Sequence, residues 1–205
     1  GAASTHPMTF PTKRLEALIS LGALEVLPRT GWLLAGAKGG ESVAGHVLGV
    51  AWLALSLAPE VDPPLDLGRC LAMAILHDAP EAASGDLPAP AAKHLPPGAK
   101  KTMESSLAQQ LITPLGALPE AYFAEYTAQK TPEAQFVHLC DKLQLGVHLV
   151  RLERAGGGDL APFHGVLEAL DCAGFDLCEE LRVALIEALR PEALAAHGAR
   201  PEKNQ

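Results

Sequence analysis

The sequence has few aromatic residues and no excess of basic side chains. Aromatic residues make up 4% of the 205 residues, whereas Leu and Ala are abundant. This balance favours helices packed through aliphatic side chains over a β-rich fold. The formal net charge of -8 argues against binding to a nucleic-acid polymer, which needs a cationic face to release counterions. We therefore expect an all-α protein that binds no nucleic-acid polymer.

Paired cysteines and targeting segments are also lacking. We find no basic head followed by an apolar stretch at the N-terminus, and no window approaching the roughly 20 apolar residues of a membrane span. The cysteines show no CxxC pattern, and three of the four lie in apolar helical patterns, where a free thiol packs as a small hydrophobic group. These features predict a soluble, cytoplasmic protein with reduced thiols. The cysteines are Cys70, Cys140, Cys172 and Cys178.

The length and composition are those of one domain. With 205 residues and 48% hydrophobic composition, the chain can bury one sizeable core and needs no second domain. We predict a single-domain helical bundle over 12–197, with a flexible N-terminus over 1–11 and a flexible tail over 198–205. Periodicity and composition predict helices over 12–27, 41–58, 67–76, 100–111, 120–129, 131–152, 161–173 and 177–189, and irregular loops over 28–40 and 87–98.

Two of the predicted helices are apolar nearly all round. They are 41–58 and the body of the helix that Thr131 and Pro132 start, and we expect both to be buried on most sides. His46 lies one turn into the first, and Asp141 lies in the middle of the second. A carboxylate buried alone costs several kcal/mol, so an acid in this position requires a compensating cation.

The most informative stretch is 74–88, AILHDAPEAASGDLP, which places ionisable side chains at the end of an apolar run. Pro80 has no N–H, and its ring would clash with the carbonyl of Leu76 in a continuous helix. We therefore predict a break at residues 78–79 that frees the side chains before it to turn toward one point. The ionisable residues of the stretch are His77, Asp78, Glu81 and Asp86.

The residues predict a mixed nitrogen and oxygen metal site. Two imidazoles and two carboxylates without a thiolate suit Mn, Fe, Co, Ni or Zn, with Mg also possible, and leave room for water. Such a set implies catalysis more than scaffolding. The candidate ligands are His46, His77, Asp78 and Asp141.

These residues resemble the signature of the HD-domain metal-dependent phosphohydrolases, which is a His, a His-Asp doublet and a distant Asp. The segments PRTGW (28–32), ESVAGH (41–46) and HDAPEAASGDLP (77–88) narrow the resemblance to the 5'-deoxynucleotidase branch. It covers roughly 12–156. The resemblance implies a helical bundle of the HD-domain type, a homodimer, and hydrolysis of deoxyribonucleoside 5'-monophosphates to deoxynucleoside and phosphate.

The resemblance also implies a role for each residue. The metal held by the four ligands would activate water and polarise a phosphate oxygen. Glu81 would orient that water or accept its proton, and Asp86 would assist the leaving 5'-oxygen or bind the sugar. Trp32 would pack against the sugar and disfavour a 2'-hydroxyl, while Arg29 would hold polar groups of the nucleotide.

The sequence departs from the pattern at three places. Gly45 replaces a usually acidic residue, Pro80 lies within the doublet region, and the loop LLAGAKGG (33–40) lacks an arginine that relatives often have. The missing arginine argues against tight nucleotide binding unless Lys38, Lys93 or Lys142 substitutes for it. Two alternatives therefore stay open: a phosphohydrolase for another small nucleotide or phosphorylated metabolite, and a degenerate domain that only binds a nucleotide.

Structural explanations compete with these roles. Trp32 could be a core anchor, and Arg29 could cap the helix that ends at residue 27. Glu81 and Asp86 could be solvated loop acids. Glu104 matches an acid of the relatives, but a surface ion pair with Lys100 or Lys101 explains it better. Of the remaining histidines, which are interpreted as structural or exposed, His138 has the best chance of belonging to the site, because it precedes Asp141 by one turn.

Overall fold

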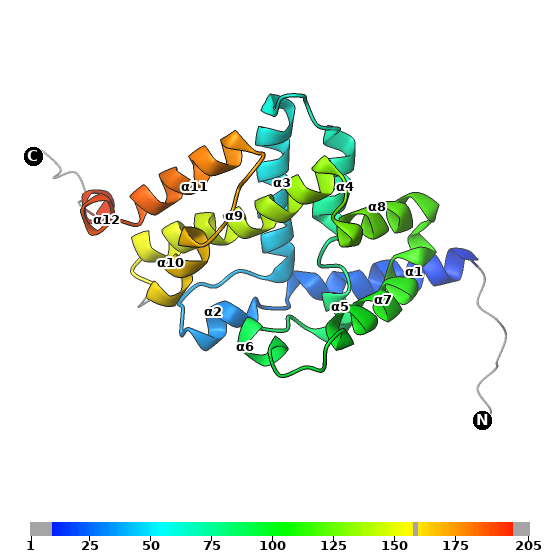
Figure 1. Cartoon of the computed structure of the whole chain (residues 1–205). Coiled ribbons are helices and arrows are strands. Elements are labelled where there is room, and N and C mark those ends of the chain that lie inside the picture. Colours follow the sequence, from blue (N-terminus) through cyan, green and yellow to red (C-terminus); the bar gives the residue numbers. More distant parts are fainter. Residues whose placement is uncertain (1–9, 158–159, 199–205) are drawn as a thin grey trace, which may run out of the picture.

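The structure is a computed structural model that describes residues 10–157 and 160–198. In these residues it contains helices and one isolated β-bridge, between Pro28 and Ser42, and no strand (Figure 1). The all-α prediction is confirmed. The α-helices are α1 Phe10–Leu21, α2 Thr30–Leu34, α3 Val43–Leu57, α4 Leu67–Leu76, α5 Glu81–Ser84, α6 Ala89–Ala92, α7 Ala99–Leu111, α8 Ala117–Ala128, α9 Pro132–Arg154, α10 Ala161–Glu168, α11 Asp176–Ala188 and α12 Pro191–Gly198, with 3-10 turns at Gly22–Glu25, Ala58–Glu60 and Thr113–Leu115.

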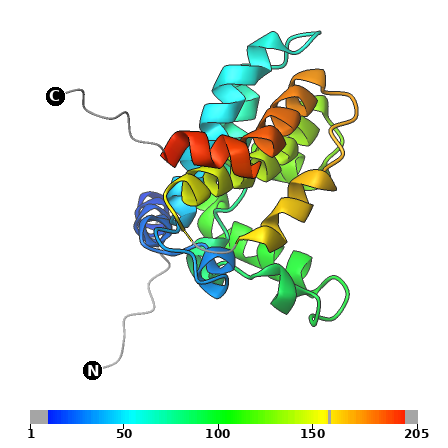
Figure 2. The same cartoon turned by 90° about the vertical axis from the view of Figure 1, so that its left-hand side faces the viewer.

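Helix α9 runs through the centre of the domain, as its apolar sequence predicts. The Thr131 hydroxyl accepts a hydrogen bond from the Ala134 N–H at 3.2 Å, and Pro132 occupies the first turn, so the helix starts where a capping residue and proline favour it. Helices α3, α4, α8, α10 and α11 all pack against it (Figures 1 and 2). Asp141 lies in the middle of this helix and is half-buried.

Helices α3 and α4 pack side by side and bring the two histidines to α9. Ser42 caps α3 through its side-chain oxygen, which accepts from the Gly45 N–H at 3.0 Å. Helix α4 ends at Leu76 and α5 begins at Glu81, so the predicted break around Pro80 is present. His77 and Asp78 lie in that break.

The prediction that α3 is buried on most sides is wrong. Its buried residues are Val43, His46, Val50 and Ala54, whereas the opposite face is open and Trp52 is 62% exposed. Val43–Glu60 is also long and apolar enough to cross a membrane by length and composition, contrary to expectation. Packing of α3 against α4 and α9 explains the apolar residues of its buried face, which also carries His46 into the core.

Several boundaries differ from expectation. The first helix begins at Phe10, inside the N-terminus predicted to be flexible, and gives way to a 3-10 turn after Leu21. Short helices α2 and α6 lie in segments predicted to be irregular, and α12 was not predicted. Residues 1–9, 158–159 and 199–205, which include most of both predicted flexible ends, lie outside the described residues. All four cysteines are free and buried, as expected.

Gly146 on α9 allows close packing of α10 and α11. A Cβ there would lie 2.6 Å from Leu167 Cδ2 and 3.0 Å from Leu185 Cδ1, both buried. We expect Gly146→Ala to destabilise the protein, because overpacking costs about 1–3 kcal/mol, more than the roughly 0.5–1 kcal/mol that alanine gains over glycine in a helix. Urea unfolding measures the difference.

Gly165→Ala on α10 is the matched control. No atom lies within 4 Å of its Cβ position, so the same substitution should stabilise the protein by about 0.5–1 kcal/mol through helix propensity alone. Equal effects of the two substitutions would contradict the packing explanation.

Candidate metal centre

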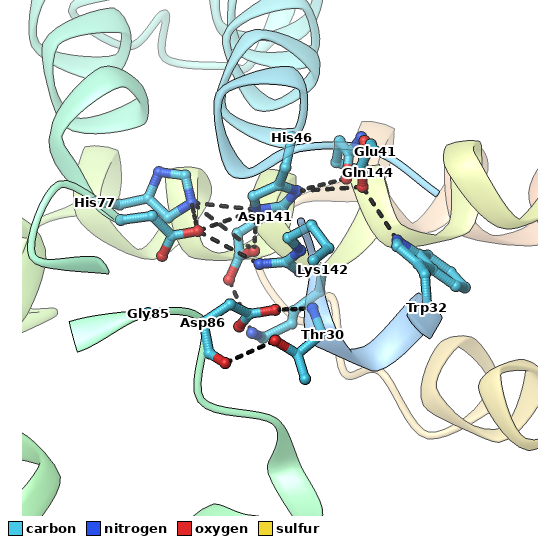
Figure 3. Close-up of polar contacts among 12 residues, drawn as sticks. Thr30, Trp32, Glu41, His46, His77, Gly85, Asp86, Asp141, Lys142 and Gln144 are labelled. Carbon is cyan, nitrogen blue, oxygen red and sulfur yellow. Dashed lines mark hydrogen bonds and ion pairs between the residues drawn. The ribbon is translucent and has the colours of Figure 1, made fainter. Parts of the chain in front are cut away.

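The four predicted ligands converge from three segments. Figure 3 shows three of them, His46, His77 and Asp141, pointing toward one another. His46 Nε2, His77 Nε2 and an Asp78 oxygen belong to a group of ligand atoms that lie within 4.8 Å of one another and could hold a metal ion. Asp141 Oδ1 lies 3.0 Å from His46 Nε2 and 4.0 Å from His77 Nε2. The side chains of His46 and His77 are buried. The break after α4, helix α3 and helix α9 thus direct all four groups to one point.

Hydrogen bonds orient both imidazoles so that Nε2 is available. His77 Nδ1 donates to the Ala74 carbonyl at 2.7 Å, and His46 Nδ1 donates to Gln144 Oε1 at 2.5 Å, since neither oxygen can donate. The two Nε2 atoms therefore face each other at 3.3 Å, beside two carboxylates. Lone pairs and negative oxygens gathered in this way repel one another unless a cation lies between them. The residues fit a divalent metal ion.

Electrostatics within the cluster support the same conclusion. Burial lowers the pKa of His77, but the charge and hydrogen bond of Asp78, together with Asp141 and the Ala74 carbonyl, outweigh burial and raise the pKa to about 9. Burial raises the pKa of Asp141, yet its contact with His46 and the charge of Lys142 hold it well below the usual range. The carboxylates thus remain negative and attract a positive charge, whether that charge is a proton on His77 or a metal ion.

A cleft of about 640 Å³ opens over this cluster. Its size matches a small-molecule site. Asp78 and Asp141 lie in its wall together with basic, acidic and apolar groups from α2, α7, α8, α9 and α10. The basic side chains that line the cleft are Arg29, Lys100 and Lys142, and its apolar and aromatic wall includes Leu87, Phe123, Tyr126, Leu145, Phe163 and Val166.

Comparison with known proteins identifies the family. Residues 21–163 match the HD domain. The chain belongs to the HD-domain family. It is 35% identical over 154 residues to the 5'-deoxynucleotidase hdd1 of Schizosaccharomyces pombe, spanning 70% of this chain and 75% of the yeast protein. It is 32% identical over 135 residues to the 5'-deoxynucleotidase HDDC2 of Homo sapiens, spanning 64% of each protein. The resemblance to the 5'-deoxynucleotidase branch is confirmed.

Solved structures agree with this placement. The PH0347 protein from Pyrococcus horikoshii superposes with a TM-score of 0.74 at 28% identity, covering 84% of this chain and 98% of that one. A predicted metal-dependent phosphohydrolase from Magnetospirillum magnetotacticum superposes with a TM-score of 0.64 at 26% identity, covering 95% and 100%. The HD-domain fold and the hydrolase class expected from the sequence are therefore confirmed.

Glu81 of this HD-domain protein lines the cleft with an unsatisfied carboxylate. Its Oε2 atom is buried and has no hydrogen-bond partner among the described residues. Burial, followed by the charges of Asp78 and Asp86, raises its pKa to about 8. The interpretation of Glu81 as a solvated loop acid is wrong, because the residue begins helix α5 and its Oε2 atom is buried. Its predicted role at the attacking water stays a prediction.

Asp86 is anchored rather than solvated. Its Oδ2 accepts from the Thr30 N–H at 2.5 Å, and the Thr30 hydroxyl donates to the Asp86 carbonyl at 2.9 Å (Figure 3). The first bond satisfies the first N–H of α2, and both bonds tie α2 to the segment that follows α5. Asp86 still lines the cleft, so its predicted role at the sugar or leaving oxygen stays a prediction beside this structural one.

Arg29 and Trp32 both line the cleft, in different ways. Arg29 Nη1 lies 3.4 Å from Asp78 Oδ2. Burial lowers the pKa of Arg29, but the negative charges around it, of which Asp78 is the strongest, together raise that pKa above its usual value. Trp32 is only 2% exposed, stacks on Phe163 with ring centroids 4.4 Å apart, and donates from Nε1 to Glu41. Trp32 is thus a core anchor that forms part of the wall, and its contact with a sugar stays a prediction.

The remaining candidates separate clearly. Lys142 lines the cleft with Nζ 2.8 Å from Asp141 Oδ2, whereas Lys38 and Lys93 are not among its lining residues. Glu104 pairs with Lys100 at 3.5 Å, which confirms its interpretation as a surface ion pair. His138 is exposed and lines the cleft, outside the metal cluster.

Sequence reasoning missed the groups that support His46. Glu41, Gln144 and His148 form a buried polar network with Trp32 behind the cluster, and Phe163 covers the Trp32 ring. Glu41 begins the segment ESVAGH (41–46) that supports the resemblance, but its position at a helix start gave it no predicted role. Gln144 and His148 are single polar residues on an apolar helix, and no local pattern indicates their partners.

Proposed function

We propose that the protein is a metal-dependent phosphomonoesterase that hydrolyses deoxyribonucleoside 5'-monophosphates to deoxynucleoside and phosphate. The observation that carries the proposal is the convergence of two imidazole Nε2 atoms and two carboxylates at the floor of a nucleotide-sized cleft, next to an unpaired buried carboxyl. The names of the relatives in yeast and human supply the substrate class.

His46, His77, Asp78 and Asp141 would hold the metal. A divalent ion bound there would supply Lewis acidity that lowers the pKa of water and polarises a phosphate oxygen. The donor set favours a transition metal among Co, Mn, Fe, Ni and Zn over Mg, because two of the four donors are imidazole nitrogens.

Glu81 would orient the attacking water and take its proton. Its free Oε2 and raised pKa suit a general base that works near neutral pH. Asp86 also lines the cleft, where it would assist the leaving 5'-oxygen while its hydrogen bond to the Thr30 N–H holds α2 in place.

Positive charge for the phosphate would come from Arg29 and Lys142. Both side chains line the cleft. The Arg29 guanidinium contacts Asp78, and the Lys142 ammonium contacts Asp141. Since an arginine fork matches phosphate oxygens in a bidentate way, Arg29 and Lys142 together would offset the arginine missing from the 33–40 loop. The apolar wall around Phe163 would take the base and sugar.

We further propose that the protein is a cytoplasmic homodimer. The open face of α3 supports an interface between copies, because Leu48, Trp52 and Leu55 share it at helical spacing and are 57%, 62% and 43% exposed. Four buried free thiols suit a reducing compartment.

Phosphate release from a substrate panel tests the function. Metal-stripped protein is supplied with Co, Mn, Zn or Mg and given deoxyribonucleotides, ribonucleotides and simple phosphate esters. Preference for deoxyribonucleoside 5'-monophosphates supports the proposal. Equal rates on ribose and deoxyribose substrates would remove the sugar role of Trp32. Preference for another phosphorylated metabolite would favour the alternative that the altered 33–40 loop leaves open, and nucleotide binding without turnover would indicate a degenerate domain.

A further inference from the structure

A buried carboxylate outside the ligand set lies at the centre of the network behind His46. The Glu41 side chain is 8% exposed. One of its oxygens accepts from Trp32 Nε1 at 3.3 Å, and the other accepts from Gln144 Nε2 at 2.8 Å and lies 3.4 Å from His148 Nδ1. Figure 3 shows Glu41 and Gln144 on the side of His46 that faces away from His77 and Asp141.

Gln144 connects this carboxylate to the ligand. Its amide gives Nε2–H to Glu41 and presents Oε1 to His46 Nδ1 at 2.5 Å. Gly49 on α3 makes the connection possible: a Cβ there would lie 2.7 Å from both Cγ and Nε2 of Gln144. The glycine therefore leaves the space through which the Gln144 side chain reaches from α9 to His46.

The direction of the amide follows from the chemistry of Glu41. An ionised carboxylate only accepts hydrogen bonds, so it must face the NH2 side of Gln144, which leaves only the carbonyl oxygen for His46. That oxygen in turn requires a proton on His46 Nδ1, and a neutral imidazole with Nδ1–H carries its lone pair on Nε2. The Glu41 carboxylate thus determines which side of the Gln144 amide faces His46 and which nitrogen of His46 donates.

We propose that Glu41, acting through Gln144, is a positioning residue that holds His46 with Nδ1 protonated and thereby offers Nε2 to the metal ion. The substitution Glu41→Gln would allow the side-chain amides of residues 41 and 144 to exchange their C=O and NH2 positions. An NH2 group of Gln144 that faces His46 Nδ1 favours the tautomer in which His46 Nε2 carries the proton. The proposal rests on the metal site of the proposed function but not on its substrate, so metal affinity tests it independently of turnover.

The first experiment is calorimetric titration of metal-free protein with Co²⁺. Glu41→Gln and Gln144→Met should each bind Co²⁺ about 10–100-fold more weakly than the unaltered protein, which is the usual loss when a hydrogen-bond partner of a ligand is removed. Glu133→Gln is the matched control: it changes another buried glutamate, which accepts from the Asp66 N–H and pairs with Arg69. Its Co²⁺ affinity should not change. Unchanged affinity in both network variants would overturn the proposal.

The second experiment displaces Gln144 indirectly, by a substitution at Gly49. Gly49→Ala should displace Gln144 and weaken Co²⁺ binding, although alanine favours the helix. Because both substitutions act through one hydrogen bond, the double variant Gly49→Ala/Gln144→Ala should bind Co²⁺ no more weakly than Gln144→Ala alone. Additive losses in the double variant would contradict the shared route.

The third measurement needs no variant that must fold. Proton–nitrogen correlation spectra of the metal-free, unaltered protein should show His46 with a hydrogen-bonded Nδ1–H. A His46 Nδ1 without a proton overturns the proposal. Protein that shows this Nδ1–H and binds Co²⁺, yet releases no phosphate from any substrate, would refute the proposed function and leave the positioning role intact.

Discussion

Asp78→Asn is expected to abolish metal binding and phosphate release together. Asp78 Oδ2 lies 3.3 Å from His77 Nε2 and 3.6 Å from His46 Nε2, so the neutral amide removes a charged donor from the middle of the cluster. Loss of a ligand should cost more than the roughly 10–100-fold that loss of a ligand's hydrogen-bond partner costs. Metal content by elemental analysis and phosphate release from a deoxyribonucleoside 5'-monophosphate measure the two effects.

Asp176→Asn makes the same chemical change at an exposed position in the first turn of α11 and should leave metal content and rate unchanged. Asp78→Asn protein with a full complement of metal would show that the carboxylate is not a ligand. Asp78 also pairs with Arg29 at 3.4 Å. A folded variant with normal metal content but weaker substrate binding would assign it to orienting Arg29 instead.

The convergence of the ligands was predictable because each depends on a local rule. Pro80 forces the end of α4, so His77 and Asp78 leave the helix at a known place. His46 and Asp141 are polar residues inside apolar helices, where an uncompensated group is costly. These constraints act within a few residues, and the sequence displays them directly.

The groups behind the ligands were not predictable because their partners are distant in the sequence. Gln144 meets Glu41 across 103 residues, and Asp86 caps α2 across 56 residues. Short helix α2 forms in a glycine-rich segment, and the distant Asp86 carboxylate accepts from its first N–H group, that of Thr30. Helix propensities within residues 28–40 cannot indicate the Asp86 carboxylate, because it lies outside this segment.

The open apolar faces were missed for a different reason. Periodicity shows that a helix has an apolar stripe but does not show what covers it. Leu15, Leu18 and Ile19 on α1 keep helical spacing and are more than half exposed, as is Trp52 on α3. The same pattern therefore describes a core face and a face left for another chain.

Glu81→Gln is expected to remove turnover while preserving the metal. Positioned proton transfer contributes about 100–10,000-fold to a rate, and Glu81 is the buried acid with an unpaired oxygen in the cleft among the described residues. Since it is not part of the ligand group, Co²⁺ affinity should be unchanged. Glu104→Gln, on the same cleft but paired with Lys100, is the control and should keep its rate. Loss of metal together with rate would make Glu81 a ligand.

The stability of metal-free protein should reveal the same carboxyl. A folded pKa of about 8 against an ordinary 4.5 means that the folded chain binds the proton more tightly than the unfolded chain. The stability that the folded protein has with Glu81 protonated is fully present below pH 4.5 and is lost progressively as the pH rises to 8. Ionised Glu81 thus destabilises metal-free protein by an amount of the order of a few kcal/mol, because burial and the charges of Asp78 and Asp86 oppose its ionisation.

Urea unfolding of the Glu81→Gln variant tests this effect. Its side chain cannot ionise, so the variant should gain stability relative to the unaltered protein between pH 5 and pH 8. An equal difference at both pH values would mean that Glu81 ionises normally and lacks the raised pKa that suits a general base.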